Sequence, residues 1–226
     1  MRIVFKIGGS IICPDGVPDI AYVRKLSKFL INLKRKNRII IVVGGGKMTK
    51  DYIRSTRTLK PSESLLDAMG ILGARMNAMV VIASLGKYAY DKVVRNREDL
   101  EHGISTGKIV VLGGTVPGQT TNAVAVAAAQ FSRSDMLIIG TNVKGIYDKD
   151  PKKFRNAKMI PKIKTKQLCE LVRAKKHVAG PLTVMDPVAA RLLERSKIRT
   201  VLLDGRNIAN LKKAIERKNF VGTVIE

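Results

Sequence analysis

Several short apolar runs of this chain end in glycine, at Gly8-Gly9, Gly44-Gly45-Gly46, Gly113-Gly114 and Gly140. Glycine lets backbone N–H groups turn towards an anion without a Cβ in the way, and a following helix adds its positive N-terminal end. Any one such turn is a purely structural tight turn about as often as it is an anion-binding site. Together, the clusters predict a large anionic ligand set, such as two phosphorylated ligands that meet head to head.

Lys6 interrupts the first apolar run two residues before Gly8. A charged side chain is costly in such a run unless it meets an anion. Phosphoryl transfer needs positive charge against the developing charge on the equatorial oxygens, and little covalent chemistry. We therefore predict that Lys6 is the catalytic residue of a phosphoryl transfer. The alternative is that its ammonium group only reaches solvent from an edge strand.

The sequence lacks the motifs of other nucleotide-binding classes. GGGKMTK at 44–50 matches the phosphate loop GxxxxGK[ST] only in composition, and no GxGxxG follows a predicted strand. Cys13, Cys169, His102 and His177 have no metal-site spacing, so we predict no metal held by protein side chains alone.

Apolar runs and helical patterns alternate along the chain. The predicted strands are 2–7, 39–43, 109–112, 136–139, 199–203 and 222–225. The predicted helices are 19–36, 62–85, 121–131, 186–195 and 207–218, and Gly70 or Gly73 could interrupt the second. The strands are continuously apolar, as in a parallel sheet covered on both faces. The pattern predicts an α/β fold, in which ligands bind outside the carboxyl ends of the strands.

The composition points to one soluble domain with a strong positive charge. No linker or repeat divides the 226 residues, so we predict a single domain, 1–226. The 42 Lys and Arg against 18 Asp and Glu leave a net charge of +24, which attracts anionic ligands or simply covers solvent-exposed faces. The basic run 152–166 is predicted to be a solvated loop or hairpin. We expect no signal peptide and no apolar window close to the ~20 residues of a membrane span, hence a cytoplasmic protein without a membrane partner.

These segments resemble the amino acid kinase family and, within it, the archaeal-type uridylate (UMP) kinases. The resemblance covers KIGGS at 6–10, VVGGGK at 42–47, LLDAMGI at 65–71, ARMNA at 74–78, GGTVPGQTTNAVAVAAA at 113–129, TNVKGIYDKDP at 141–151 and VMDPVAARLLERSKIRT at 184–200. It implies a three-layer αβα sandwich around a mainly parallel eight-stranded sheet. It also implies transfer of the γ-phosphoryl group of ATP to UMP in pyrimidine nucleotide synthesis, with Mg²⁺ carried by the nucleotide, and a homohexamer.

The resemblance also implies roles for residues on the acceptor side. Gly45 would face the UMP phosphate, and Asp67 would accept hydrogen bonds from the UMP ribose. A loop would wrap UMP with its backbone N–H groups and threonine hydroxyls, and it consists of Thr115, Val116, Pro117, Gly118, Gln119, Thr120 and Thr121. The simpler alternative for Asp67 is an acid on a helix surface.

On the donor side, Gly9 and Ser10 would hold the ATP phosphates, with Gly46 and Lys50 nearby. The adenosine side would be formed by Thr141, Asn142, Tyr147 and Asp150, with Tyr147 as an apolar wall. Tyr147 and Asp150 could instead belong only to an Asp-Lys-Asp-Pro turn, where Asp and Pro are common.

The chain departs from the family pattern at three positions. Lys144 replaces the usual aspartate near the ATP side, which reverses a charge. Lys50 replaces an arginine and can meet phosphate only as a point charge, without a bidentate fork. Val116 lies at a position that varies among relatives.

Two further acids have open roles. Asp135 could orient a catalytic lysine, or be an ordinary acid that precedes a strand. Asp186 precedes a proline at the start of a predicted helix, and we predict only a helix cap there.

Two other functions compete with the UMP kinase hypothesis. One is a kinase of the same fold that acts on carbamate, an amino acid or an isoprenoid phosphate, for which a ribose-binding acid would have no purpose. The other is a nucleic-acid-binding or regulatory protein that lost catalysis, suggested by the net charge and Lys144. Five Phe, five Tyr and no Trp leave few side chains for base stacking, so nucleic acid is not the expected partner.

Overall fold

The computed structural model describes residues 1–151, 153–174, 185–196 and 198–226. Its strands are β1 (Arg2–Ile7), β2 (Arg38–Val43), β3 (Ala89–Val94), β4 (Ile109–Leu112), β5 (Met136–Thr141), β6 (Ile146–Tyr147), β7 (Met159–Ile160), β8 (Lys162–Ile163), β9 (Arg199–Asp204) and β10 (Thr223–Ile225). Its α-helices are α1 (Gly9–Ile12), α2 (Ile20–Lys34), α3 (Gly46–Thr56), α4 (Glu63–Leu85), α5 (Arg97–Ser105), α6 (Thr121–Phe131), α7 (Thr165–Ala174), α8 (Pro187–Glu194) and α9 (Ile208–Ile215). The short 3₁₀ helices η1 (Arg57–Leu59) and η2 (Gly86–Tyr88) follow α3 and α4.

Eight of these strands form one central sheet in the order β3-β4-β2-β1-β5-β9-β10-β8. The neighbouring strands pair in parallel except β9 and β10, which are antiparallel. β6 and β7 form a separate two-stranded antiparallel sheet. The predicted mainly parallel α/β sheet is therefore confirmed.

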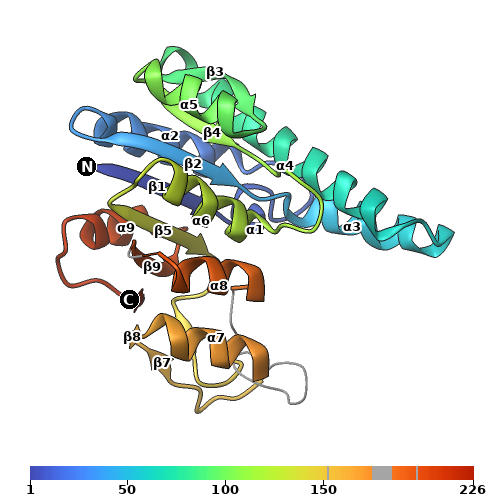
Figure 1. Cartoon of the computed structure of the whole chain (residues 1–226), viewed down its shortest axis with the longest axis vertical. Coiled ribbons are helices and arrows are strands. Elements are labelled where there is room, and N and C mark those ends of the chain that lie inside the picture. The colour runs from blue at the N-terminus through green and yellow to red at the C-terminus, as the bar shows by residue number, and fades with distance from the viewer. Residues whose placement is uncertain (152, 175–184, 197) are drawn as a thin grey trace.

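Helices cover both faces of the sheet, which makes three layers (Figure 1). Successive side chains of a strand point to opposite faces. Val4 of β1 accordingly packs in the core that α6 and α8 cover, while Phe5 packs in the core that α2, α4 and α9 cover. Both faces are buried, which is why the strands are apolar throughout and not alternating.

Most predicted elements appear within a few residues of their expected bounds. The helix expected over 62–85 is α4, and it is continuous through both glycines. A Cβ at Gly73 would lie 1.9 Å from the Thr49 hydroxyl oxygen, so glycine is needed there for the close approach of α3 and does not break the helix. The expected interruption was wrong because close packing imposes a glycine as strictly as a turn does.

The expectation about apolar windows was also wrong. The helical stretch Glu63–Tyr88, which joins α4 and η2, is long and apolar enough by length and composition to cross a membrane. The mean hydropathy of its most apolar 18-residue window is 1.6. That window is 33% buried within the fold. The helix is apolar around most of its circumference because one side packs on the sheet while the other exposes residues such as Leu72 and Met76.

The basic run 152–166 is only partly a loop. Lys152 lies outside the described residues. Within the rest of the run, β7 pairs with β6, and β8 joins the edge of the main sheet parallel to β10. Thr165 then begins α7. Strands of two residues are too short to show a periodic pattern, so they could not be predicted from the sequence of this run.

Candidate functional site

The glycine turns meet at the carboxyl edge of the sheet, where α1, α3 and α6 begin. The backbones of two turns touch: a Cβ at Gly9 would lie 2.0 Å from the Gly46 nitrogen. Gly46 itself has a φ of +77°, in the left-handed region that favours glycine. Glycine is therefore required at these positions by the backbone geometry alone, whether or not a ligand binds. The glycine turns also bring helix N-termini together, which concentrates positive partial charge at one place.

A cavity of about 330 Å³ lies beside these turns, between α3, α4 and the segment 114–121. It brings together nine of the predicted site residues: Gly45, Gly46, Lys50, Asp67, Val116, Gly118, Gln119, Thr120 and Thr121. The rest of its lining is mostly apolar or small: Thr49, Ile53, Leu66, Gly70, Ile71, Ala74 and Gly114. Lys50, predicted on the donor side, thus lies on the same cavity as the predicted acceptor residues.

Two predicted loop residues lie outside this cavity. Thr115 lines a neighbouring cavity of about 420 Å³ behind the loop, together with Arg95 and Phe131. Pro117 lines neither of these cavities. Val116 and Gln119 line both, so the loop forms a thin wall between them.

Helix α4 holds the loop in place through two charged side chains. The Asp67 carboxylate accepts a hydrogen bond of 2.6 Å from the Gly118 backbone N–H. The Arg75 guanidinium, two turns further along, donates to the carbonyl oxygens of Gly114 at 3.0 Å and Thr115 at 3.3 Å. Asp67 is therefore more than a surface acid. Arg75 is a positioning residue that the sequence reasoning missed, although it lies in the ARMNA segment.

The same helix also holds the triple-glycine turn. The buried Asn77 side-chain amide donates to the carbonyl oxygens of Gly44 at 2.8 Å and Gly45 at 2.9 Å. The Thr49 hydroxyl donates to the Gly45 carbonyl as well, at 2.8 Å. The sequence did contain a signal for Asn77, since it is an asparagine in an apolar helix. A buried amide needs hydrogen-bond partners, so such a residue is expected to hold a neighbouring segment.

Lys6 is buried at the centre of this edge. It belongs to β1, which is flanked by β2 and β5, so the alternative of a lysine on an edge strand is wrong. Its Nζ lies 3.7 Å from the point where a Cβ at Gly8 would be. Burial lowers the pKa of Lys6 from 10.5 to about 8, against the opposing effect of the Asp186 carboxylate and with a further lowering by the positive charge of Lys50.

Asp186 links two helix N-termini at this point. One carboxylate oxygen caps α8 by accepting from the backbone N–H groups of Val188 at 3.1 Å and Ala189 at 2.9 Å. The other accepts from the hydroxyl of Thr120 at 2.5 Å, and Thr120 itself caps α6 through Ala123. The predicted helix cap is confirmed, but the prediction that Asp186 is only a cap was wrong. Its carboxylate also accepts a hydrogen bond from Thr120 of the predicted UMP loop, and its charge raises the pKa of Lys6.

The predicted donor residues follow β5, on the side of β1 away from the cavity. Thr141 is buried at the end of β5, and Asn142 is exposed immediately after it. Tyr147 lies in β6, where it pairs with Met159, and the Asp150 carbonyl accepts the N–H groups of a following turn. None of the four lines the 330 Å³ cavity. Since the strand order is β2-β1-β5, Lys6 lies between the cavity and this segment.

Gly9 and Ser10 belong to α1, directly after the turn at Gly8. Gly9 is buried and Ser10 is half-buried. The Gly8 N–H donates to the Gly140 carbonyl at 2.9 Å, which ties this turn to the end of β5.

Asp135 lies at the opposite edge of the sheet. It precedes β5, and its carboxylate accepts the Arg2 backbone N–H at 2.7 Å, at the amino end of β1. A role in orienting a lysine at the glycine turns is excluded by this position, so the ordinary strand-leading acid is the correct interpretation.

Among the described residues, no group of three or more His, Cys, Asp and Glu side chains could hold a metal ion. Asp67 and Asp186, the carboxylates nearest the site, already accept hydrogen bonds from Gly118 and Thr120. A divalent cation here would need oxygen ligands from a phosphorylated ligand as well.

Comparison with known proteins agrees with this geometry. The family model described as "Amino acid kinase family" matches residues 1–204. The chain is 41% identical to a protein of Methanocaldococcus jannaschii named uridylate kinase and 40% identical to one of Thermococcus onnurineus with the same name, each over the full length of both chains. The crystal structure of uridylate kinase from Archaeoglobus fulgidus matches with a TM-score of 0.87 and 36% identity, over all of both chains. The protein belongs to the amino acid kinase family.

Proposed function

We propose that this protein is a uridylate kinase, which transfers the γ-phosphoryl group of ATP to UMP and releases ADP and UDP. The observation that carries the proposal is the position of the buried Lys6 between the acceptor cavity and the segment after β5. The full-length relatives named uridylate kinase support the same assignment. A nucleoside monophosphate is a ligand of the right size, because small-molecule sites begin at about 300 Å³.

On the acceptor side, the cavity offers a distinct contact for each part of UMP. The phosphate binds at the N-terminus of α3, beside Gly45 and the ammonium group of Lys50. The ribose hydroxyls bind the Asp67 carboxylate, which holds the Gly118 N–H in this structure. The base lies along the loop, with the side chains of Gln119 and Thr120 within the cavity wall.

On the donor side, the ATP phosphates bind at Gly9 and Ser10, where α1 begins. The adenosine extends along the segment after β5, against Thr141, Asn142, Tyr147 and Asp150. The support for this assignment is the strand order, because the two nucleotides then approach from opposite sides of β1 and meet at Lys6.

The chemistry needs charge stabilisation and alignment more than a base. An oxygen of the UMP phosphate attacks the γ-phosphorus in line, and the bond to the bridging oxygen of ADP breaks. The attacking oxygen is already ionised near neutral pH, since the second pKa of a phosphate monoester is about 6. Lys6 places its ammonium charge against the transferring group, and the converging helix N-termini of α1, α3 and α6 add N–H donors.

We propose that Mg²⁺ enters as the MgATP complex, because the described residues near the site offer few free carboxylates of their own. We also propose a cytoplasmic location, where ATP and UMP are available and where free thiols such as those of Cys13 and Cys169 persist.

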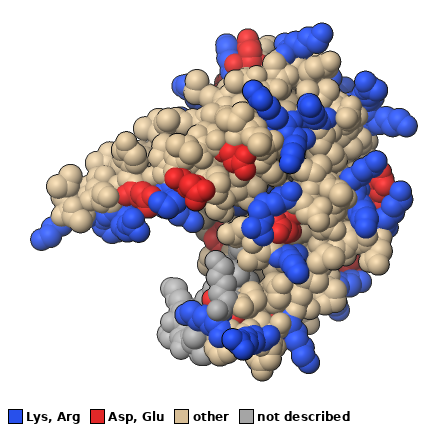
Figure 2. Space-filling model, turned by 180° about the vertical axis from the view of Figure 1, so that it is seen from behind, with Lys and Arg blue, Asp and Glu red and all other residues tan. Residues whose placement is uncertain are grey.

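The proposed assembly into a homohexamer rests on the arm formed by α3 and α4, which projects from the molecule in Figure 1 and carries few charged side chains along its upper side in Figure 2. Its exposed apolar residues are Tyr52, Leu59, Leu65, Leu72, Met76 and Met79. Copies that each carry a net charge of +24 repel one another, so an uncharged apolar face is where they can meet. A second copy presenting the same face would bury both in a symmetric contact.

A screen of phosphoryl acceptors tests the function. ADP release is measured with UMP, CMP, carbamate, N-acetylglutamate and an isoprenoid phosphate, and we expect a clear preference for UMP. No preference for UMP would refute the assignment. Tight RNA binding at physiological salt without turnover of UMP would instead favour a nucleic-acid-binding protein.

The variant Asp67→Asn sharpens this test. It keeps the size of the side chain but weakens hydrogen bonds from the ribose, so the KM for UMP should rise about tenfold. The KM for ATP should change much less. An equal rise in both values would mean that Asp67 does not bind the acceptor.

A further inference from the structure

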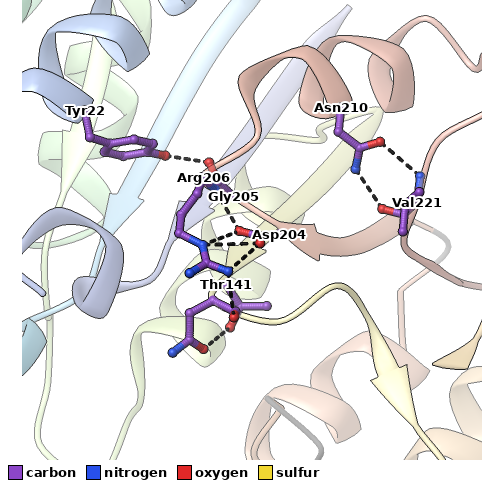
Figure 3. Close-up of polar contacts among 8 residues, drawn as sticks. Tyr22, Thr141, Asp204, Gly205, Arg206, Asn210 and Val221 are labelled. Atoms are coloured by element: carbon purple, nitrogen blue, oxygen red, sulfur yellow. Dashed lines mark hydrogen bonds and ion pairs between the residues drawn. The ribbon is translucent and has the colours of Figure 1, made fainter. Parts of the chain in front are cut away.

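A second polar cluster lies at the carboxyl ends of β5 and β9, away from the acceptor cavity (Figure 3). The two strands pair in parallel up to Thr141 and Asp204, and the Gly205 N–H then donates to the Thr141 carbonyl at 2.9 Å. A Cβ at Gly205 would lie 2.9 Å from the Gly140 Cα, so the turn after β9 packs directly on the end of β5. The cluster therefore lies where the proposed ATP segment begins.

Arg206 connects the two chain segments of this cluster. Its guanidinium donates to both carboxylate oxygens of Asp204, at 2.6 to 3.2 Å, and its backbone N–H donates to the same carboxylate at 3.0 Å. The Nη2 atom also donates to the Asn142 carbonyl at 3.3 Å. Asn142 is one of the residues that we assign to the adenosine side. The guanidinium thus fixes the backbone of the donor segment to the end of β9.

The base of this cluster is fixed by helix α2. The hydroxyl of Tyr22 donates to the Gly205 carbonyl at 2.7 Å, and Tyr22 is buried. Burial raises the pKa of Tyr22, and the nearby carboxylates of Asp204 and Asp19 raise it further, so the hydroxyl stays a donor. Arg206 therefore extends from a rigid turn to the more exposed segment at Asn142.

The carboxylate of Asp204 in this cluster interacts electrostatically with Lys144, the residue that replaces the usual aspartate. Burial raises the pKa of Asp204, but the hydrogen bonds and charge of Arg206, together with the charge of Lys144, outweigh this and hold the pKa below its ordinary value. Asp204 is thus an ionised carboxylate within electrostatic reach of Lys144. It supplies negative charge in a region where this chain has lost the aspartate that is usual at position 144.

We propose that Arg206, held by Asp204, is a positioning residue for the donor nucleotide. It acts by fixing the Asn142 carbonyl and hence the segment 141–147, which carries Tyr147 and Lys144. This inference rests on the proposed function, since it takes ATP as the donor. A purely structural role fits less well, because the Arg206 side chain is 59% exposed and exposed ion pairs contribute little to global stability.

The test compares Arg206→Ala and Arg206→Lys with wild type. Arg206→Ala should raise the KM for ATP about tenfold, leave the KM for UMP within twofold, and barely change the melting temperature. Arg206→Lys keeps the charge but loses the fork geometry, and should give an intermediate value. Lys218→Ala is the matched control, since it breaks another exposed ion pair, with Glu216 after α9, and should change nothing.

Equal increases in the two KM values, or a loss of activity that follows only the melting temperature, would overturn the inference. Direct ATP binding by calorimetry separates it from the proposed function. If wild type binds ATP but does not phosphorylate UMP, the proposed function fails, and the ratio of ATP Kd values between Arg206→Ala and wild type still decides the inference. If wild type does not bind ATP, both fail.

Discussion

Lys6 lies in a central strand, packed among apolar residues, and burial lowers its pKa to about 8. A lysine that is harder to protonate in the folded chain than in the unfolded chain destabilises the fold near neutral pH. The same ammonium group lies between the proposed acceptor and donor sites, where a bound phosphate would restore its favourable electrostatics. Stability and activity are therefore opposed at this residue.

The first prediction concerns Lys6→Met, which keeps the length of the side chain and removes the charge. The kcat should fall at least 100-fold, since the transferring group loses its cation. The free energy of unfolding at pH 7 should rise, by up to about 3 kcal/mol for a pKa shift of this size. Steady-state kinetics and urea unfolding measure the two effects. Lys25→Met, at an exposed position of α2, is the control and should change neither.

The second prediction concerns pH and has a definite sign. The pKa of Lys6 is about 8 when folded and 10.5 when unfolded, so between these values the unfolded chain binds more protons. The destabilising effect of Lys6 is thus complete below about pH 8 and disappears as the pH rises towards 10.5. The difference in unfolding free energy between Lys6→Met and wild type should shrink over that range. A constant difference would show that Lys6 is not the group that titrates.

The activity should fall over the pH range in which the destabilising effect of Lys6 on the wild-type fold disappears. If the protonated form of Lys6 is required, kcat/KM should decline as the pH passes about 8, because kcat/KM reports the groups of the free enzyme.

At the scale of elements, helix α4 organises the acceptor side. Its side chains Asp67, Arg75 and Asn77 hold the loop and the triple-glycine turn, over three turns of one helix. The junction between α6 and α8 has a similar arrangement, since Asp186 and Thr120 cap one helix each and bond to each other. Rigid elements place the polar groups, and the loops supply the contacts.

The third prediction tests this role of α4. Arg75→Ala removes the two hydrogen bonds to the carbonyls of Gly114 and Thr115 and so loosens the loop. The KM for UMP should rise about tenfold, while the KM for ATP stays nearly constant. The control is Arg54→Ala on α3, an exposed arginine in an ion pair with Asp51. A similar rise of the UMP KM in both variants would argue against a specific role for Arg75.

At the scale of the whole molecule, the α3–α4 arm has an apolar side next to a charged one. Lysine and arginine side chains are spread over much of the face shown in Figure 2, while the α3–α4 arm exposes Leu72, Met76 and Met79. The proposed self-association would account for the apolar side of α4 without a membrane.

The fourth prediction places a charge on this arm. Leu72→Glu should convert the assembly to smaller species, because a carboxylate buried between copies has no partner. Light scattering coupled to size-exclusion chromatography measures the mass directly. Val17→Glu, at an exposed position between α1 and α2, should leave the mass unchanged. A wild-type protein that is monomeric at micromolar concentration would remove the basis of the assembly proposal.

Several features followed from the sequence because they depend on local chemistry. Continuous apolar runs such as 39–43 predict strands of a parallel sheet, and the glycines after them predict turns at its carboxyl edge. Most helices with an apolar stripe were found as well, but α7 was missed although it buries Leu168, Cys169 and Val172. Helices α3 and α5 were not found, since they bury only Gly46, Thr49, Leu100 and Gly103 and so lack that stripe. Strand β3 was missed because Asp91 and Lys92 interrupt its apolar pattern.

The sequence by itself determined the fold class, the family and most of the segments that line the 330 Å³ cavity. Only the tertiary structure showed that Asp186 bonds to Thr120, that Arg75 and Asn77 hold the glycine turns, and that Arg206 reaches Asn142. These contacts join residues 32 to 66 positions apart. Periodicity and glycine spacing report what the local backbone can do, whereas such pairs exist only once the packing of helices on the sheet has brought distant segments together.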